Sequence, residues 1–272
     1  MTPASPPTPG LAPVPKEPPW YRPVGNECEL FETAFRQQVP LLLKGPTGCG
    51  KSRLVEHMAA RLGRPLVTVA CHDETSAVDL SGRYLVEGGD TVWQDGPVTR
   101  AVRSGAILYL DEFAEARSDV VVVIHPLTDH RRTLYVERHD EQIEAAPGFM
   151  LVVSYNPGYQ RGLKELKPST RQRFLAATLS HPDPDVELEI LQGETGIDTA
   201  NGKKLCALVH KLRELEPLGL AEMPSTRLIV NAARLIQAGL PARMACDAAI
   251  VESLTDDAEI ASGLRDLVAL VF

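Results

Sequence analysis

Short apolar runs recur through the first two thirds of the chain, and each is long enough for one buried strand. Between them, apolar residues recur every three or four positions, as they do around Glu27–Gln38 and from Leu54 to Leu62, just before Gly63. Short buried strands that alternate with helices are typical of a parallel sheet in an α/β domain. The runs are Leu41–Leu43, Leu66–Ala70, Ala106–Leu110 and, as the last expected strand, Phe149–Ser154.

The pattern changes after the Pro-rich stretch His181–Pro184, where strand signals stop. Apolar residues then recur at helical spacing over Leu205–Leu215 and again over Leu228–Ile236. We therefore predict an α/β domain over residues 21–183 and a small helical domain over residues 184–272. Residues 1–20 hold eight of the 22 prolines and almost nothing to bury, which predicts a disordered leader.

Composition and charge narrow the class of protein. The chain has 272 residues, 44% hydrophobic and 24% charged, as a soluble globular protein does. Its net charge of −8 lacks the positive field that non-specific nucleic-acid binding uses, so no nucleic-acid partner is expected. The five cysteines are scattered without a C-x-x-C pair, and no apolar run approaches the length of a membrane span. We expect a cytoplasmic protein with no disulfide framework and no structural zinc.

An octet after the first predicted strand matches the phosphate-binding sequence G-x-x-x-x-G-K-[ST] and opens a helix, as that motif requires. Its glycines let backbone N–H groups turn toward phosphate oxygens, and the helix N-terminus favours an anion. We predict that Lys51 reaches the β- and γ-phosphates of ATP and that the hydroxyl of Ser52 binds Mg²⁺. The predicted nucleotide-binding residues here are Gly45, Pro46, Thr47, Gly48, Cys49, Gly50, Lys51 and Ser52.

Two later strands end in polar residues that suit phosphoryl transfer. Asp111 would belong to the magnesium shell and Glu112 would polarise a water for attack on the γ-phosphate, although an Asp-Glu pair alone is also a common helix cap. Asn156 follows the next strand, at the edge where open parallel sheets bind ligands, and would orient that water. Its alternative is an Asx turn before Pro157.

Three arginines complete the predicted set. Arg171 and Arg173 follow the last predicted strand, and one of them is a candidate for an arginine that neutralises charge at a neighbouring subunit's phosphoryl group. Arg227 opens a helix of the small domain and would contact the nucleotide from that side. The alternative for each is a solvated surface arginine.

These elements, in this order, resemble an AAA+ ATPase over about residues 21–272. Longer runs make the chain similar to the MoxR group, and within it to the CbbQ/NirQ/NorQ subgroup. The runs are Pro23–Glu27, Lys44–Lys51, Leu66–His72, His125–Asp129 and Asn156–Gln160.

The resemblance implies a homo-oligomeric ring, usually a hexamer, whose nucleotide sites lie between subunits. Arg171 or Arg173 would then act on the neighbouring site, and we favour Arg173 because it directly precedes Phe174. Val24 and Gly25 would lie against the adenine. Two hairpin insertions are expected near residues 83–93 and 132–146. The first would face the ring axis, where Tyr84 or Trp93 could touch a client, unless Trp93 packs the hairpin itself.

Members of the subgroup are expected to hydrolyse ATP to remodel a client enzyme, together with a partner that carries a von Willebrand factor A domain. We expect Rubisco as the client, freed of inhibitory sugar phosphates, because the run Leu166–Phe174 looks closer to the CbbQ branch. The alternative is the NirQ/NorQ branch, which serves metal-cofactor insertion into nitric oxide reductase. A hypothesis of another class is a nucleotide-gated binding scaffold, in which ATP only fixes the ring.

Overall fold

The structure is a computed structural model, and it describes residues 13–157, 166–214, 220 and 222–272. The chain divides into two compact units. The first holds Gly25–Gly45 and Gly50–Thr178, with the described residues up to Pro19. The second holds Trp20–Val24, Pro46–Cys49 and Leu179–Phe272. Most of the leader that we expected over residues 1–20 lies outside the described residues.

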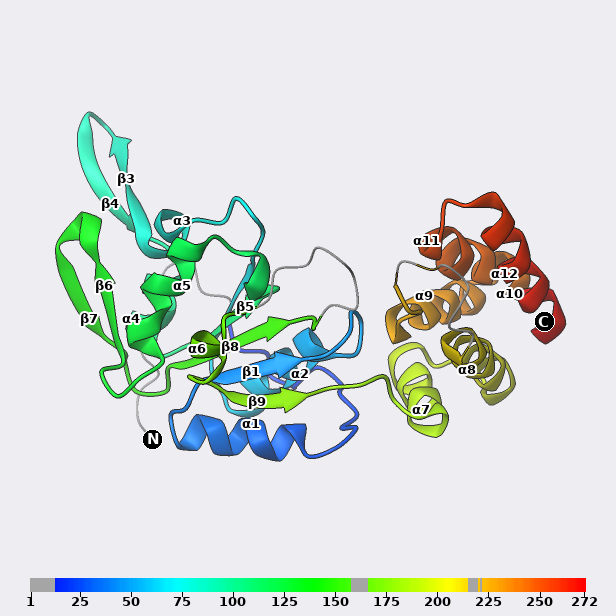
Figure 1. The fold of residues 1–272 in the computed structure, drawn as a ribbon. Coiled ribbons are helices and arrows are strands. Elements are labelled where there is room, and N and C mark those ends of the chain that lie inside the picture. The colour runs from blue at the N-terminus through cyan, green and yellow to red at the C-terminus, as the bar shows by residue number, and fades with distance from the viewer. Residues whose placement is uncertain (1–12, 158–165, 215–219, 221) are drawn as a thin grey trace. The chain divides into compact units, whose positions relative to one another are not determined.

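The first unit is built on a parallel sheet, which in the described residues has five strands in the order β2-β5-β8-β1-β9 (Figure 1). Lys44 of β1 pairs with Tyr155 of β8, so these two strands end level with each other. The predicted parallel α/β fold is thereby confirmed. The strands are β1 Leu41–Lys44, β2 Leu66–Ala70, β5 Ile107–Asp111, β8 Met150–Tyr155 and β9 Leu175–Thr178.

Helices cover the sheet because successive strand side chains point to opposite faces. Leu42 and Leu108 belong to one buried cluster with Val98 and Val102 of α4, whereas Leu43 is equally buried outside that cluster. On the other face, α1 and α2 contact β9 and β5. This two-sided burial explains why the central strands are apolar throughout. The helices are α1 Glu27–Arg36, α2 Lys51–Arg61, α3 Ala77–Ser81, α4 Pro97–Ser104, α5 Ser118–Ile124 and α6 Pro168–Arg171, with the 3₁₀ turns η1 Phe113–Glu115 and η2 His125–Leu127.

One strand differs from the sequence prediction. We expected Phe149–Ser154 to be the last strand, but β9 follows it and pairs with β1 at the edge of the sheet. Its apolar run, Leu175–Ala177, is short and contains two alanines, and only Ala177 of the four strand residues is buried. Arg171 and Arg173 therefore lie in the connection between β8 and β9, and not beyond the sheet.

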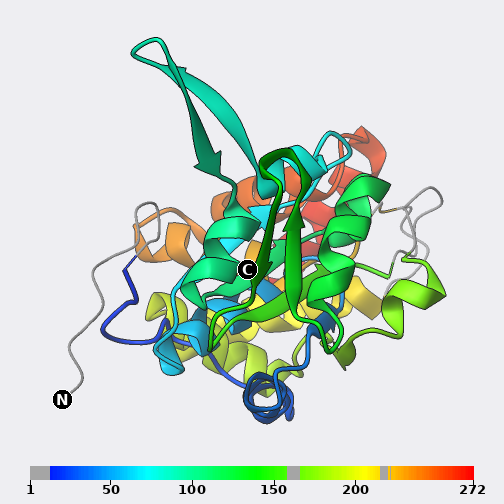
Figure 2. The same ribbon diagram turned by 90° about the vertical axis from the view of Figure 1, so that its left-hand side faces the viewer.

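Two hairpins extend from the same side of the first unit (Figures 1 and 2). The first pairs β3 Gly82–Glu87 with β4 Asp90–Asp95, and Gly88 and Gly89 form its turn with φ of 62° and 96°. Positive φ at both central residues matches the twist of a two-residue hairpin and favours glycine there. The second pairs β6 Thr133–Val136 with β7 Glu141–Glu144, and the 3₁₀ turn η3 Glu137–His139 lies between them.

The second unit is helical and has a buried core of its own, which includes Leu205, Val209 and Ile229. A fully buried carboxylate, that of Glu187, joins three of its helices. No helix in the described part of the chain is both long and apolar enough to cross a membrane. The helices are α7 Pro184–Thr195, α8 Thr199–Glu214, α9 Thr226–Gln237, α10 Ala242–Cys246, the π turn η4 Asp247–Val251, α11 Glu252–Leu254 and α12 Ala258–Val271.

Candidate nucleotide-hydrolysis site

The loop between β1 and α2 has the backbone of a phosphate cradle. Gly48 and Gly50 have φ of 72° and 99°, which residues with a Cβ rarely adopt. Gly50 is the N-cap of α2, and no side chain caps this helix. The first N–H groups of an α-helix have no partner within the helix, and they suit an anion.

Lys51 and Ser52 follow the loop, and their side chains bind at different places. The ammonium of Lys51 donates to the carbonyl of Gly45, with 2.7 Å between the atoms. The hydroxyl of Ser52 donates to Oδ2 of Asp111 at 3.2 Å, across to β5. The structure thus brings together Lys51, Ser52 and Asp111, which lie up to 60 positions apart in the chain.

The carboxylate of Asp111 has two differently bound oxygens. Oδ1 accepts hydrogen bonds from the hydroxyls of Tyr109 at 2.7 Å and Ser154 at 2.5 Å, whereas Oδ2 faces Ser52. Burial, followed by the negative charge of Asp111, raises the pKa of Tyr109, which keeps its hydroxyl protonated and able to donate. A carboxylate oxygen beside a hydroxyl is the kind of ligand pair that Mg²⁺ takes in phosphoryl-transfer sites, so the donor set fits the predicted ion.

Glu112 follows in a left-handed conformation, with φ of 54° and ψ of 41°. Its N–H donates to the hydroxyl of Ser154 at 3.0 Å, and the residue is exposed. The N–H of Cys71 donates to the carbonyl of Asp111 at 2.8 Å, and burial together with the charges of Asp111 and Glu112 raises the pKa of this thiol to about 12. The thiol of Cys71 is therefore uncharged beside the two acids.

Asn156 comes directly after β8, at the edge where the phosphate loop begins. The carbonyl of Tyr155 accepts from the N–H of Gly45 at 3.4 Å, so the residue before Asn156 touches the first residue of the loop. Asn156 is half-buried. The structure thus gathers Gly45, Asp111 and Asn156 along one edge of the sheet, as the strand directions predicted.

The two candidate arginines of the β8–β9 connection differ in their surroundings. Nη1 of Arg173 lies 3.7 Å from Oδ2 of Asp129. That carboxylate is also held by Arg131, whose hydrogen bonds keep the pKa of Asp129 well below its usual range, so it stays charged. Arg171 ends α6, and within the described residues its side chain has no hydrogen bond or ion pair.

The remaining predicted residues are divided between the units. Gly25 is in the first unit, and its N–H donates to the carboxylate of Glu27 at 2.8 Å. Val24 and Arg227 belong to the second unit, where Arg227 is the second residue of α9. The adenine contact of Val24 and Gly25 and the nucleotide contact of Arg227 stay predictions.

The sequence analysis missed Tyr109 and Ser154. Both lie inside strands that are otherwise apolar up to their last residue, and their exposed fractions are 1% and 0%. A buried hydroxyl needs a hydrogen-bond partner, so a lone polar residue two positions from a predicted catalytic residue was a usable signal. It did not reveal which atoms the two hydroxyls bind, because that depends on the register between β5 and β8.

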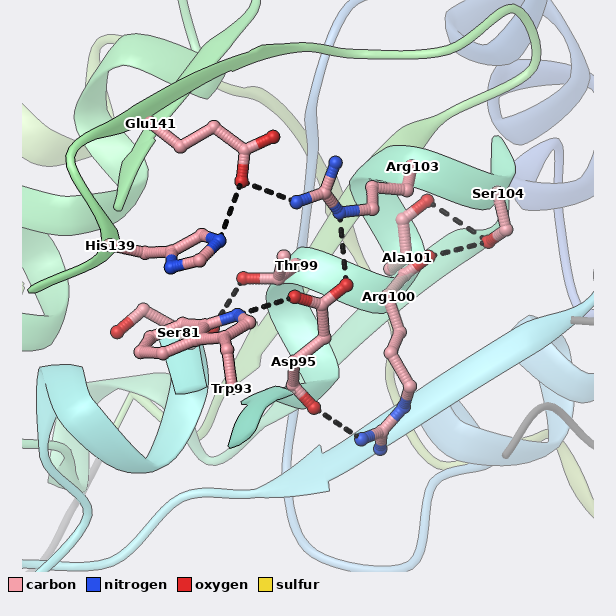
Figure 3. A network of polar contacts seen from close by, with 10 residues as sticks. All are labelled: Ser81, Trp93, Asp95, Thr99, Arg100, Ala101, Arg103, Ser104, His139 and Glu141. Atoms are coloured by element: carbon pink, nitrogen blue, oxygen red, sulfur yellow. Dashed lines mark hydrogen bonds and ion pairs between the residues drawn. The ribbon is translucent and has the colours of Figure 1, made fainter. Parts of the chain in front are cut away.

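The two hairpins are joined by aromatic and ionic contacts (Figure 3). The indole of Trp93 stacks on the imidazole of His139, and the hydroxyl of Tyr84 lies 3.1 Å from Nδ1 of that ring. Arg103 of α4 bridges Asp95 at 2.9 Å and Glu141 at 2.5 Å. Trp93 therefore packs against the second hairpin, a contact that the sequence did not predict, while Tyr84 remains 48% exposed.

Comparison with known proteins places the chain in a class. Residues 40–174 match the AAA domain of the dynein-related subfamily, and residues 187–271 match the CbbQ/NirQ/NorQ C-terminal domain. The first match covers the strands β1, β2, β5 and β8 and the acids described above, and it ends just before β9. The protein is an ATPase with an AAA nucleotide-binding domain, as the sequence predicted.

Individual relatives narrow this class. Protein NorQ of Paracoccus denitrificans (strain Pd 1222) is 60% identical over 254 residues, covering 93% of this chain and 94% of that protein. The denitrification regulatory protein NirQ of Pseudomonas aeruginosa is 54% identical, covering 93% and 97%, and Protein CbbQ of Hydrogenophilus thermoluteolus is 51% identical, covering 93% and 95%. The chain belongs to the CbbQ/NirQ/NorQ family.

The fold is shared with solved structures. A protein from Cytophaga hutchinsonii ATCC 33406 superposes with a TM-score of 0.51 at 18% identity, over 91% of this chain and 89% of that one. This likeness concerns the fold alone.

Proposed function

We propose that the chain forms a ring that binds ATP with Mg²⁺ between subunits and uses its hydrolysis to remodel a client enzyme. The observation that carries the proposal is the junction at the end of β5, where Asp111 meets Ser52 and the exposed Glu112 follows. A metal-binding carboxylate directly before a water-activating one is the arrangement that ATP hydrolysis requires.

Each residue has a role that follows from its position. Lys51 would leave the carbonyl of Gly45 for the β- and γ-phosphates, and backbone N–H groups of the loop would bind phosphate oxygens. Ser52 and Oδ2 of Asp111 would hold Mg²⁺, which neutralises charge on the phosphates when bound. Glu112 would accept a proton from the attacking water, which Asn156 would orient.

The charge that develops on the γ-phosphate needs a further cation, which we propose comes from the next subunit. Both Arg171 and Arg173 remain candidates. Arg173 is engaged by Asp129 of its own chain, whereas Arg171 has no such partner among the described residues. This difference favours Arg171 as the arginine that reaches across, in place of the preference for Arg173 that its position before Phe174 suggested.

The identity of the client enzyme is proposed from the similar proteins and not from the geometry of the site. The sequence expectation of Rubisco lacks specific support, because Protein NorQ is 60% identical to this chain and Protein CbbQ 51%. We therefore propose a NorQ-type role, in which the ring and a partner with a von Willebrand factor A domain prepare nitric oxide reductase for its metal cofactor. Rubisco activation is the second candidate, supported by the CbbQ relative and the run Leu166–Phe174.

A trapping experiment separates these candidates. Tagged Glu112→Gln ring, incubated with ATP in extract of the native cells, should retain its client because it binds ATP without hydrolysing it. The matched control is Lys51→Ala, which should retain nothing that depends on ATP. Capture of nitric oxide reductase subunits with a von Willebrand factor A protein supports the proposal, and capture of Rubisco moves the function to the second candidate.

The scaffold hypothesis needs a different measurement. Client activation is measured with wild-type ring and with Glu112→Gln, both saturated with ATP. The proposal predicts activation by the wild type alone. Equal activation by both would show that ATP serves only to fix the ring.

A further inference from the structure

Ser154 joins the two acids of the hydrolysis site, although it lies more than 40 residues from both in the chain. It is the fifth residue of β8, next to β5 in the sheet, and its exposed fraction is 0%. Its hydroxyl lies 2.5 Å from Oδ1 of Asp111 and 3.0 Å from the backbone nitrogen of Glu112.

Elementary hydrogen-bond accounting fixes the direction of both bonds. A backbone N–H can only donate, so the oxygen of Ser154 must accept from Glu112. The single proton of the hydroxyl is then available for Oδ1 of Asp111, which as a carboxylate can only accept. Neither bond can be reversed.

These bonds determine what each acid presents to the nucleotide. Oδ1 of Asp111 is taken by Ser154 and by Tyr109, which leaves Oδ2 toward Ser52. The backbone of Glu112 is held from both sides, because its N–H binds Ser154 and its carbonyl accepts from the N–H of Glu115 at 2.9 Å. A left-handed conformation is costly for a residue with a side chain and persists where surrounding bonds enforce it.

We propose that Ser154 is a positioning residue for ATP hydrolysis: it holds Glu112 in the left-handed conformation that aims its carboxylate at the attacking water, and it orients Asp111 so that Oδ2 faces the metal. The inference rests on the proposed function, because it assigns Ser154 an effect through Glu112. Ser154 is expected to affect the rate of the chemical step. It is not expected to affect nucleotide binding, which depends on the phosphate loop.

The test begins with Ser154→Ala, which removes one oxygen and adds no volume. Hydrolysis of bound ATP in a single turnover should slow by at least about tenfold, since small displacements of a reacting group have effects of this size. The Kd of a fluorescent ATP analogue should change by less than about threefold. Amide hydrogen exchange in a peptide spanning residues 107–116 should become faster, because Glu112 loses its acceptor.

The matched control is Thr99→Ala. The hydroxyl of Thr99 is equally buried and donates to the carbonyl of Ser81 at 2.5 Å, away from the acids. It should lower the melting temperature to a similar extent as Ser154→Ala and leave the single-turnover rate unchanged. Equal slowing by both substitutions would show a merely structural role and would overturn the inference.

A double variant distinguishes failure of the inference from failure of the proposed function. If Ser154 acts through Glu112, then Ser154→Ala should slow hydrolysis little further when Glu112 is already Gln. If Glu112→Gln hydrolyses ATP slowly and Ser154→Ala hydrolyses it at the wild-type rate, the inference is overturned but the proposed function is not. A Glu112→Gln that hydrolyses at the wild-type rate would overturn the proposed role of Glu112, on which the inference rests.

Discussion

The imidazole of His139 lies nearly parallel to the indole of Trp93, with 4.7 Å between ring centroids and 8° between ring planes. His139 belongs to η3 of the second hairpin and Trp93 to β4 of the first, so this stack joins two insertions that are separated by α4, β5 and α5 along the chain. Arg103 adds ion pairs to Asp95 and Glu141 (Figure 3). We conclude that the two hairpins of the described structure form one coupled element.

A substitution in the second hairpin that removes the stack should therefore increase the mobility of the first hairpin. His139→Ala loses an aromatic contact worth about 0.5–1.5 kcal/mol and the bond to Tyr84. We expect faster amide hydrogen exchange over residues 82–95, with the basal rate of ATP hydrolysis unchanged. The control is Arg138→Ala, the exposed neighbour in η3, which should leave exchange as it is. If exchange in the first hairpin is the same in all three proteins, the hairpins are not coupled.

Lys51→Ala should weaken nucleotide binding. The ammonium donates to a carbonyl in the described structure and would donate to charged phosphates in the complex, and such charge-assisted bonds contribute about 1.5–3 kcal/mol. The Kd for ATP should rise by about 10- to 100-fold, measured by titration with a fluorescent analogue. Lys203→Ala, at an exposed position of α8, is the matched control and should bind normally. Normal binding by Lys51→Ala would contradict its assignment.

The arginine from the neighbouring subunit can be identified by mixing variants. Arg171→Ala should slow hydrolysis by about 10³-fold or more, while Arg173→Ala, which mainly breaks the pair with Asp129, should slow it far less. Rings mixed from Arg171→Ala and Glu112→Gln should hydrolyse faster than either parent, because some sites then combine an intact Arg171 with an intact Glu112. A mixture that never exceeds its parents would argue against sites shared between subunits.

The second unit depends on one buried ion pair. The carboxylate of Glu187 accepts two hydrogen bonds from Arg213, at 2.9 and 3.0 Å, and one from Thr226 at 2.6 Å. Arg213→Ala would leave this buried charge with Thr226 and the imidazole of His210, 3.2 Å away, but without the guanidinium, and such a loss costs about 3–5 kcal/mol. Arg234→Ala breaks the exposed pair with Glu194 and should cost under about 1 kcal/mol of unfolding free energy. Urea denaturation compares them, and similar losses would mean that Glu187 is not critical.

The sequence predicted those parts of the fold that leave a strong local pattern. The strand Leu66–Ala70 lies where its apolar run predicted. Of the other predicted strands, the first is one residue shorter than β1, and the remaining two are each shifted by one residue from β5 and β8. The strand β9 was missed because its apolar run is short and contains two alanines, which are depleted in strands, and because its register with β1 is a long-range contact.

In the candidate site, too, residues in local motifs were predicted, and residues that act through long-range contacts were not. The phosphate loop, Asp111 and Glu112 follow from motifs in which chemistry requires certain residues at fixed spacing. Ser154 and Tyr109 act on Asp111 through side-chain hydrogen bonds, and their geometry follows only from the folded sheet. The pairing of Arg173 with Asp129, which bears on the proposed choice between Arg171 and Arg173, likewise joins residues that no local pattern connects.

The most direct test of this account is single-turnover hydrolysis by Glu112→Gln, with the Kd for ATP measured on the same protein. The substitution keeps the size of the side chain and removes the charge that accepts a proton from water. The account predicts a loss of about 10²-fold or more in rate, the contribution of a general base, with ATP bound as tightly as in the wild type. Hydrolysis at the wild-type rate would contradict the assignment of Glu112.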